Sequence, residues 1–177
     1  MMRNAKLEIV VAATDLSESS ERAVAWAAHL AAEQKATLVL AHAFVPPTPP
    51  PSIPEYMPLP TEMYAEERNR AIAKLAEQAA ALRKGGLPVD TWFDTGPAVD
   101  VVIAAIRQRK ADLLVVGTHS YTGWRRIFLG SNAARLIRKA PCPVLTVHPT
   151  DQPWEEEHDA HAEEAEAQHE HEQEVRT

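Results

Sequence analysis

Cysteine is almost absent from this sequence, and so are long apolar runs. Cys142 is the only cysteine among 177 residues, so the chain can form no internal disulfide, which suits a reducing cytoplasm. Because Cys142 stands between Pro141 and Pro143, we expect a small buried turn residue rather than a redox centre. No apolar run approaches the roughly 18 residues of a membrane span. Residues 1–15 contain no cleavage-like site, so we expect no signal peptide and a cytoplasmic protein.

The sequence also has no concentrated run of positive charge. The net charge is −7, but residues 151–177 hold 11 acidic residues and one arginine, which leaves residues 1–150 close to neutral. This pattern argues against a nucleic-acid surface and against binding to anionic membranes. We expect a domain over residues 1–150 and an acidic tail over 151–177 that is disordered or loosely helical. The four histidines of the tail leave a weak Zn²⁺ or Ni²⁺ site open as the less favoured alternative.

Apolar runs of strand length alternate with segments of helical periodicity. Ser17 is a natural N-cap for the first helix, and Gly85 and Gly86 end the second. The inward face of that second helix is expected to carry Tyr64, Ala71, Ile72, Leu75, Ala79 and Leu82. The strands are expected at 7–15, 36–45, 87–94, 112–117 and 143–148, and the helices at 17–34, 61–86, 98–110 and 131–140.

Strands that are apolar throughout and separated by helices predict a parallel sheet covered on both faces. The fold class is therefore a single doubly wound α/β domain with a five-stranded parallel sheet. Such sheets bind ligands beyond the carboxyl ends of the strands, where the strand order reverses. Asp15 ends the first strand, residues 42–44 end the second, and a glycine-containing loop follows the fourth.

Glycine is scarce, yet three of the six glycines fall between residues 115 and 149. Gly117 leaves a strand, and Gly130 with Ser131 opens the next helix. Glycine lets the backbone approach a ligand and adopt positive φ, and a helix N-terminus suits phosphate. The Ser131 hydroxyl could donate to the same oxygens while capping the helix. A tight turn with a capped helix and no ligand explains the spacing equally well.

Three segments resemble a known family. "ATDLSESSERAVAWAAHLA", "LVLAHAFVPP" and "GTHSYTGWRRIFLGSNAARLIRKAPCPVLTVHP" are similar to the universal stress proteins, over roughly residues 6–149. The resemblance implies a cytoplasmic, homodimeric α/β domain. It also implies that the last strand pairs with its twin across a two-fold axis and buries Val144 and Val147. Proline at Val147 is then expected to remove a ladder donor and shift the protein towards monomer.

ATP-binding members of that family carry Gly, two residues, Gly, nine residues, Gly, then Ser or Thr. This sequence matches at Gly117, Gly130 and Ser131, and departs at Ser120, where the pattern has glycine. The resemblance implies ATP or AMP as the ligand, with Mg²⁺ as a companion ion. By this resemblance, the nucleoside would contact Asp15 and its neighbours Ala13 and Thr14. The adenine edge would contact the backbone of Ala43, and the ribose would contact Gly117. The phosphates would accept hydrogen bonds from the N–H groups of Ser120, Gly130, Ser131 and Asn132.

Two classes of function remain open at this point. The favoured class is a nucleotide-linked regulator in a stress response, with any hydrolysis slow. The alternative is an interaction protein that binds no nucleotide and works through its dimer surface and acidic tail. Asp15 with Ser17 could form a catalytic pair, but no histidine is placed to activate the serine, so we expect no catalytic residues.

Overall fold

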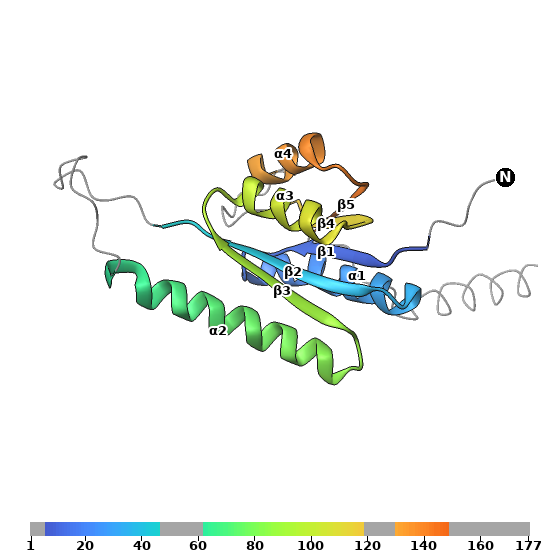
Figure 1. Ribbon diagram of the computed structural model, residues 1–177, viewed down its shortest axis with the longest axis horizontal. Coiled ribbons are helices and arrows are strands. Elements are labelled where there is room, and N and C mark those ends of the chain that lie inside the picture. The colour runs from blue at the N-terminus through green and yellow to red at the C-terminus, as the bar shows by residue number, and fades with distance from the viewer. Residues whose placement is uncertain (1–5, 47–61, 119–129, 149–177) are drawn as a thin grey trace, which may run out of the picture.

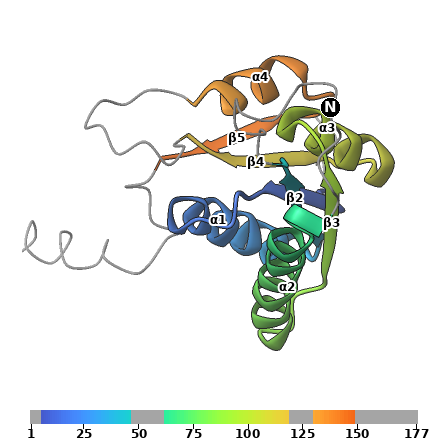
Figure 2. The same ribbon diagram turned by 90° about the vertical axis from the view of Figure 1, so that its left-hand side faces the viewer.

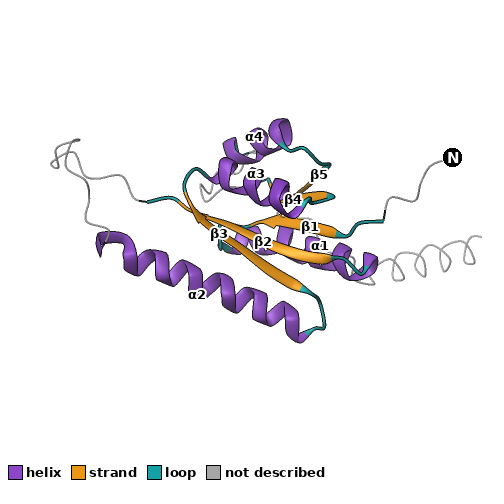
Figure 3. Ribbon diagram, in the orientation of Figure 1, coloured by secondary structure: helices purple, strands orange, loops and turns teal. Residues whose placement is uncertain are grey.

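Five strands alternate with four helices in the part of the chain that the computed structural model describes, residues 6–46, 62–118 and 130–148 (Figures 1 and 3). The acidic tail, residues 47–61 and Ser120 lie outside these ranges. No helix within the described ranges has the length and apolar composition needed to cross a membrane. The elements are β1 (Ile9–Ala13), α1 (Glu18–Gln34), β2 (Thr37–Phe44), α2 (Glu62–Lys84), β3 (Val89–Thr95), α3 (Ala98–Arg109), β4 (Leu113–Gly117), α4 (Ser131–Lys139) and β5 (Val144–Val147).

The strands form one parallel sheet in the order β3-β2-β1-β4-β5. The chain starts in the middle of the sheet, proceeds outward to β3, and returns to the other side of β1 to form β4 and β5. The strand order therefore reverses between β1 and β4, which opens a crevice beyond their carboxyl ends. The predicted doubly wound fold is confirmed.

Helices α1 and α2 cover one face of the sheet, and α3 and α4 cover the other (Figure 2). Successive residues of each strand point to opposite faces, so each strand contributes side chains to two apolar clusters, one on each face of the sheet. The α1/α2 cluster includes Val10, Ala12, Leu38, Leu40 and Val115, and the α3/α4 cluster includes Val11, Val39, Ala41, Leu114 and Val116. Burial on both faces explains why the central strands read as continuous apolar runs.

The helix ends follow the predicted capping residues. Ser17 is the N-cap of α1, and its side chain accepts a hydrogen bond from the Ser20 N–H at 3.3 Å. Helix α2 ends at Lys84, and Gly86 follows with φ of +84°. The prediction for Ile72 is wrong, because its side chain is 36% exposed. Helix α2 packs mainly on β2 and β3 at one side of the sheet, and Ile72 lies outside its buried stripe.

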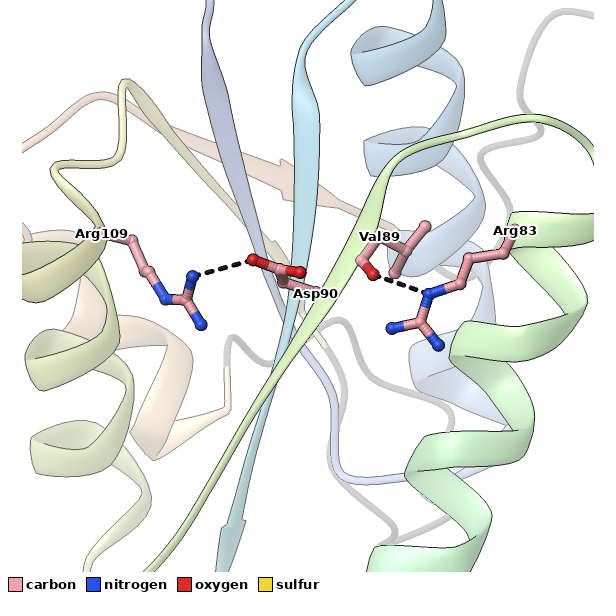
Figure 4. Close-up of polar contacts among 4 residues, drawn as sticks. All are labelled: Arg83, Val89, Asp90 and Arg109. Carbon is pink, nitrogen blue, oxygen red and sulfur yellow. Dashed lines mark hydrogen bonds and ion pairs between the residues drawn. The ribbon is translucent and has the colours of Figure 1, made fainter.

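Strand β3 does not fit the expectation of strands that are apolar throughout. It is an edge strand in which Val89 is buried while Asp90 and Thr91 are exposed. Helices on either side bind it: Arg83 Nε donates to the Val89 carbonyl at 2.8 Å, and Arg109 Nη1 lies 2.8 Å from Asp90 Oδ2 (Figure 4). An edge strand borders water, so polar side chains at these positions carry no desolvation cost.

Strand β5 is the opposite edge, as predicted, but the predicted role of Val147 is wrong. Leu114 N donates to Pro143 O at 3.0 Å and Thr118 N donates to Val147 O at 2.9 Å, so alternate residues from 143 to 147 direct their backbone groups at β4. Thr146, one position before Val147, therefore directs its own N–H and C=O groups outward. Val147 is already buried in the α1/α2 cluster within one chain, with only 4% of its surface exposed. A partner strand would thus meet Thr146, and proline at Val147 would break the β4–β5 ladder instead.

Cys142 lies half-buried in the turn before β5. Burial raises the pKa of its thiol, so the thiolate is disfavoured. Its side chain packs against the α3/α4 cluster. These features agree with a structural turn residue that is less deeply buried than expected.

Candidate functional site

A cavity of about 150 Å³ opens at the carboxyl end of the sheet, where the strand order reverses. Its floor comes from the ends of β1, β2 and β4, and its walls come from the first turns of α1, α3 and α4. A dry cavity of about this volume can hold an aromatic ring. The site is thus built from segments that lie far apart in the sequence and meet through the parallel topology.

Eight of the nine site residues expected from the sequence line this cavity, and Ser120 lies outside the described residues. The eight are Ala13, Thr14, Asp15, Ala43, Gly117, Gly130, Ser131 and Asn132. The structure therefore brings together residues from four separate segments around one space.

The remaining lining residues were not anticipated. They are mostly small or apolar: Ser20, Ala41, Ala98, Val102, Val116 and Ala133. The sequence of β2 could have predicted this space, because large side chains at positions 38, 40, 42 and 44 alternate with alanine at 41 and 43. Since alternate residues face opposite sides of the sheet, both alanines face α3 and leave space that leucine would fill.

The turn between β1 and α1 forms one rim of the cavity. The Thr14 hydroxyl accepts a hydrogen bond from the Leu16 N–H at 3.0 Å and lies 3.0 Å from Ser20 Oγ. Asp15 Oδ1 accepts from the Ser17 N–H at 3.0 Å and from the Ser17 hydroxyl. Thr14 therefore shapes the turn, while Asp15, which is exposed, presents carboxyl oxygens that accept hydrogen bonds at the rim.

His42 supports this rim from below. It is buried in β2, and its Nδ1 lies 2.9 Å from the Thr14 carbonyl oxygen. A carbonyl only accepts hydrogen bonds, so Nδ1 carries the proton. The ring packs against Phe93, with a centroid distance of 5.7 Å. His42 therefore acts in the structure of the turn and does not face the cavity as a base.

The N-terminus of α4 forms the opposite rim. Gly130 is the N-cap, with φ of −55° and ψ of 146°, and no side chain caps the helix. The prediction that Ser131 caps α4 is wrong, because Ser131 is the first helical residue. The N–H groups of a first helical turn have no acceptor within their own helix, and they carry partial positive charge. This rim is therefore suited to an anionic group.

The glycines at the two rims do not use the backbone freedom that was predicted for them. Positive φ among the described glycines occurs at Gly86 and Gly96, and neither Gly117 nor Gly130 adopts it. A Cβ built on Gly117 would lie 3.8 Å from both Ala23 Cβ and Ser19 O, which is ordinary contact. The described fold thus has room for a methyl side chain at Gly117.

Metal-binding groups do not gather near this cavity. Within residues 6–46, 62–118 and 130–148, no three His, Cys, Asp or Glu side chains come together in a way that could hold a metal ion. The tail histidines lie outside these ranges. The cavity as described therefore offers hydrogen-bonding groups and apolar walls.

Comparison with known proteins gives a consistent match. The family model for the universal stress protein family matches residues 6–148. A Thermus aquaticus protein named universal stress protein in QAH/OAS sulfhydrylase 3′ region is 32% identical over 141 residues, which cover 78% of this chain and 96% of that protein.

Solved structures agree with this match. A universal stress protein solved in complex with cAMP is 29% identical and has a TM-score of 0.62, covering 82% of this chain and 100% of its own. A universal stress protein family protein of Arabidopsis thaliana, solved with AMP bound, has a TM-score of 0.55 at 21% identity, covering 80% of this chain and 91% of its own. At that identity the second likeness shows a common fold.

Proposed function

This chain belongs to the universal stress protein family, and from that premise we propose that it binds an adenine nucleotide in the cavity at the carboxyl end of its sheet. The observation that carries the proposal is the convergence of eight residues, expected from the family motif, around one space of about 150 Å³. The cAMP complex of a relative that is 29% identical supports the same ligand class. ATP, AMP and cAMP share the adenosine group that such a cavity would enclose.

The two rims suit different parts of the ligand. The base and ribose would lie against the alanines of β2 and near Asp15, whose carboxylate can accept a hydrogen bond from a ribose hydroxyl. The phosphates would lie at the first turn of α4, where the helix dipole favours an anion by about 0.3–1 kcal/mol at an exposed site. The open side of the cavity would let one, two or three phosphates extend outward.

The role that fits this site is regulation through nucleotide occupancy. Among the described residues, the polar side chains that line the cavity are Thr14, Asp15, Ser20, Ser131 and Asn132, and these include no nucleophile–base pair. A change in bound nucleotide would then be the signal that the protein reports in a stress response. A cytoplasmic location remains part of this proposal.

We also propose that two copies pair through β5. The outward N–H and C=O groups of Val144 and Thr146 offer a short edge that a second β5 can satisfy. If the protein binds no nucleotide, this edge would be the main functional surface of the described domain. The protein would then be the interaction protein described above as the alternative.

Binding can be tested directly on the full chain. Nucleotide retained through purification is identified by mass spectrometry after denaturation, and the emptied protein is then titrated calorimetrically with ATP, AMP, cAMP and GTP. We expect saturable binding of at least one adenine nucleotide and weaker binding of GTP, which lacks the adenine edge. Absence of binding by all three adenine nucleotides, or equal binding of GTP, would contradict the proposal.

A further inference from the structure

The turn that carries Asp15 contains a strained residue. Leu16 has φ of 61°, in the left-handed region that branched and bulky side chains rarely adopt. Its side chain is 8% exposed and belongs to the α1/α2 cluster. Such a conformation persists only where the surrounding structure determines it, and it is common at ligand sites.

Hydrogen bonds from two other elements, and one within the turn, hold the backbone of this turn. From β2, the Ala41 carbonyl accepts from Thr14 N at 3.0 Å, and His42 Nδ1 donates to Thr14 O at 2.9 Å. From α2, Lys74 Nζ donates to Leu16 O at 2.7 Å. The Leu16 N–H bonds within the turn to the Thr14 hydroxyl. The carbonyl of the strained residue is therefore bonded by a charged group that lies 58 residues further along the chain.

Lys74 cannot serve the cavity by direct contact. Neither Lys74 nor Leu16 is among the residues that line the cavity, whereas Asp15 is. The Lys74 ammonium group bonds to the backbone of the turn at Leu16, the residue next to Asp15. The structure therefore links Lys74 to the site through the backbone of Leu16.

We propose that Lys74 is a positioning residue for the nucleotide site: its ammonium group holds the left-handed Leu16 through the carbonyl oxygen and so fixes where Asp15 stands. This inference rests on the proposed nucleotide binding and adds a link between α2 and the site. The hydrogen bond from the Lys74 ammonium group to the Leu16 carbonyl is charge-assisted, and it connects α2 to the turn that carries Asp15. Loss of the lysine charge, as in Lys74→Met, frees the turn without touching the cavity.

The first test is a double-mutant cycle of nucleotide affinity in the full chain. Lys74→Met should weaken binding of the best adenine nucleotide by about three- to tenfold, since a hydrogen bond to a charged group is lost. Lys74→Arg, which keeps a donor, should restore most of the affinity. Arg70→Met is the matched control: it removes one positive charge from the exposed face of α2, where Arg70 pairs with Glu66, and should change affinity less than about twofold.

The cycle with Asp15→Ala distinguishes positioning from general stabilisation. If Lys74 acts through Asp15, the effect of Lys74→Met should vanish in the Asp15→Ala background. Additive effects, or a loss of affinity in Arg70→Met equal to that in Lys74→Met, would overturn the inference.

A second measurement needs no nucleotide. Amide hydrogen exchange at Leu16 and Ser17, followed by NMR in the ligand-free protein, should be faster in Lys74→Met, with exchange in β1 and β4 unchanged. Unchanged exchange at both amides would overturn the inference even if nucleotide binds. If the wild type binds no nucleotide but exchange is accelerated, the proposed function fails while the hold of Lys74 on the turn stands.

Discussion

Filling the cavity should raise stability while weakening nucleotide binding, and Ala98→Leu is the substitution that best separates these two effects. Ala98 is half-buried in the first turn of α3 and lines the cavity, as does Val102 one turn later. Residues four apart share a helix face, and leucine side chains in helices point toward the helix N-terminus. The new side chain should therefore occupy the space that the proposal assigns to the nucleoside.

The expected size of the stability change follows from the burial of Ala98. Leucine adds three carbon groups, each worth about 0.8 kcal/mol when fully buried. Because the position is half-buried, we expect the free energy of unfolding to rise by about 1 kcal/mol and Tm by about 2–4 °C. A ligand forced to compete with this side chain should lose about 1–3 kcal/mol of binding free energy, or roughly five- to 150-fold in affinity.

The assay pairs thermal unfolding by circular dichroism with calorimetric titration of an adenine nucleotide. Ala73→Leu on the exposed face of α2 is the matched control, and it should change neither property appreciably. Unchanged affinity in a folded Ala98→Leu protein would refute the assignment of the cavity to the nucleotide. A fall in Tm of several degrees would instead show that the space is too small for leucine, and the reasoning on packing would be wrong.

Three further predictions test separate parts of the structure. Gly117→Ala should leave Tm within about 2 °C, because its Cβ would lie 3.8 Å from both Ala23 Cβ and Ser19 O, which is ordinary contact; a fall in Tm of several degrees on thermal unfolding would show that this packing is tighter than described. Thr146→Pro removes an outward N–H of β5 and should shift a folded dimer to monomer by light scattering, whereas Thr146→Ala should not. Dimers that persist in the proline variant would place the interface elsewhere. Burial raises the pKa of the Cys142 thiol, so at pH 8 the folded protein should react with iodoacetamide more slowly than the unfolded chain, measured by mass spectrometry. Equal rates would show that the thiol is freely accessible.

Much of the architecture follows from patterns that act over a few residues. Apolar runs of strand length, helical periodicity, the Ser17 cap and the Gly86 terminator each depend on neighbours within about one helical turn. Parallel pairing then follows because strands buried on both faces require helices between them. The motif residues could be assigned to one edge for the same reason, since the carboxyl ends of parallel strands meet there.

Several features could not be read from the chain alone. Ile72 belongs to the helical pattern of α2, yet the position of α2 over β2 and β3 leaves its side chain 36% exposed. The expected cap at Ser131 is wrong because the helix begins one residue earlier than a serine cap would need, with Gly130 as its N-cap. The register of β5 against β4 decides whether Thr146 or Val147 directs its backbone N–H and C=O groups outward. A shift of one residue in this register would turn the groups of Val147 outward and those of Thr146 toward β4.

The sequence by itself determined the order of strands and helices and the fold class, because these depend on local periodicity and capping, and its resemblance to a family pointed to eight residues that line the cavity. The tertiary structure alone decided that alanines on β2, α3 and α4 face one another across an open space. It also decided that Lys74 bonds to the carbonyl of Leu16, 58 residues away. Contacts of this kind are fixed by strand register and by how the helix layers pack on the sheet, and no pattern within a few residues carries that information.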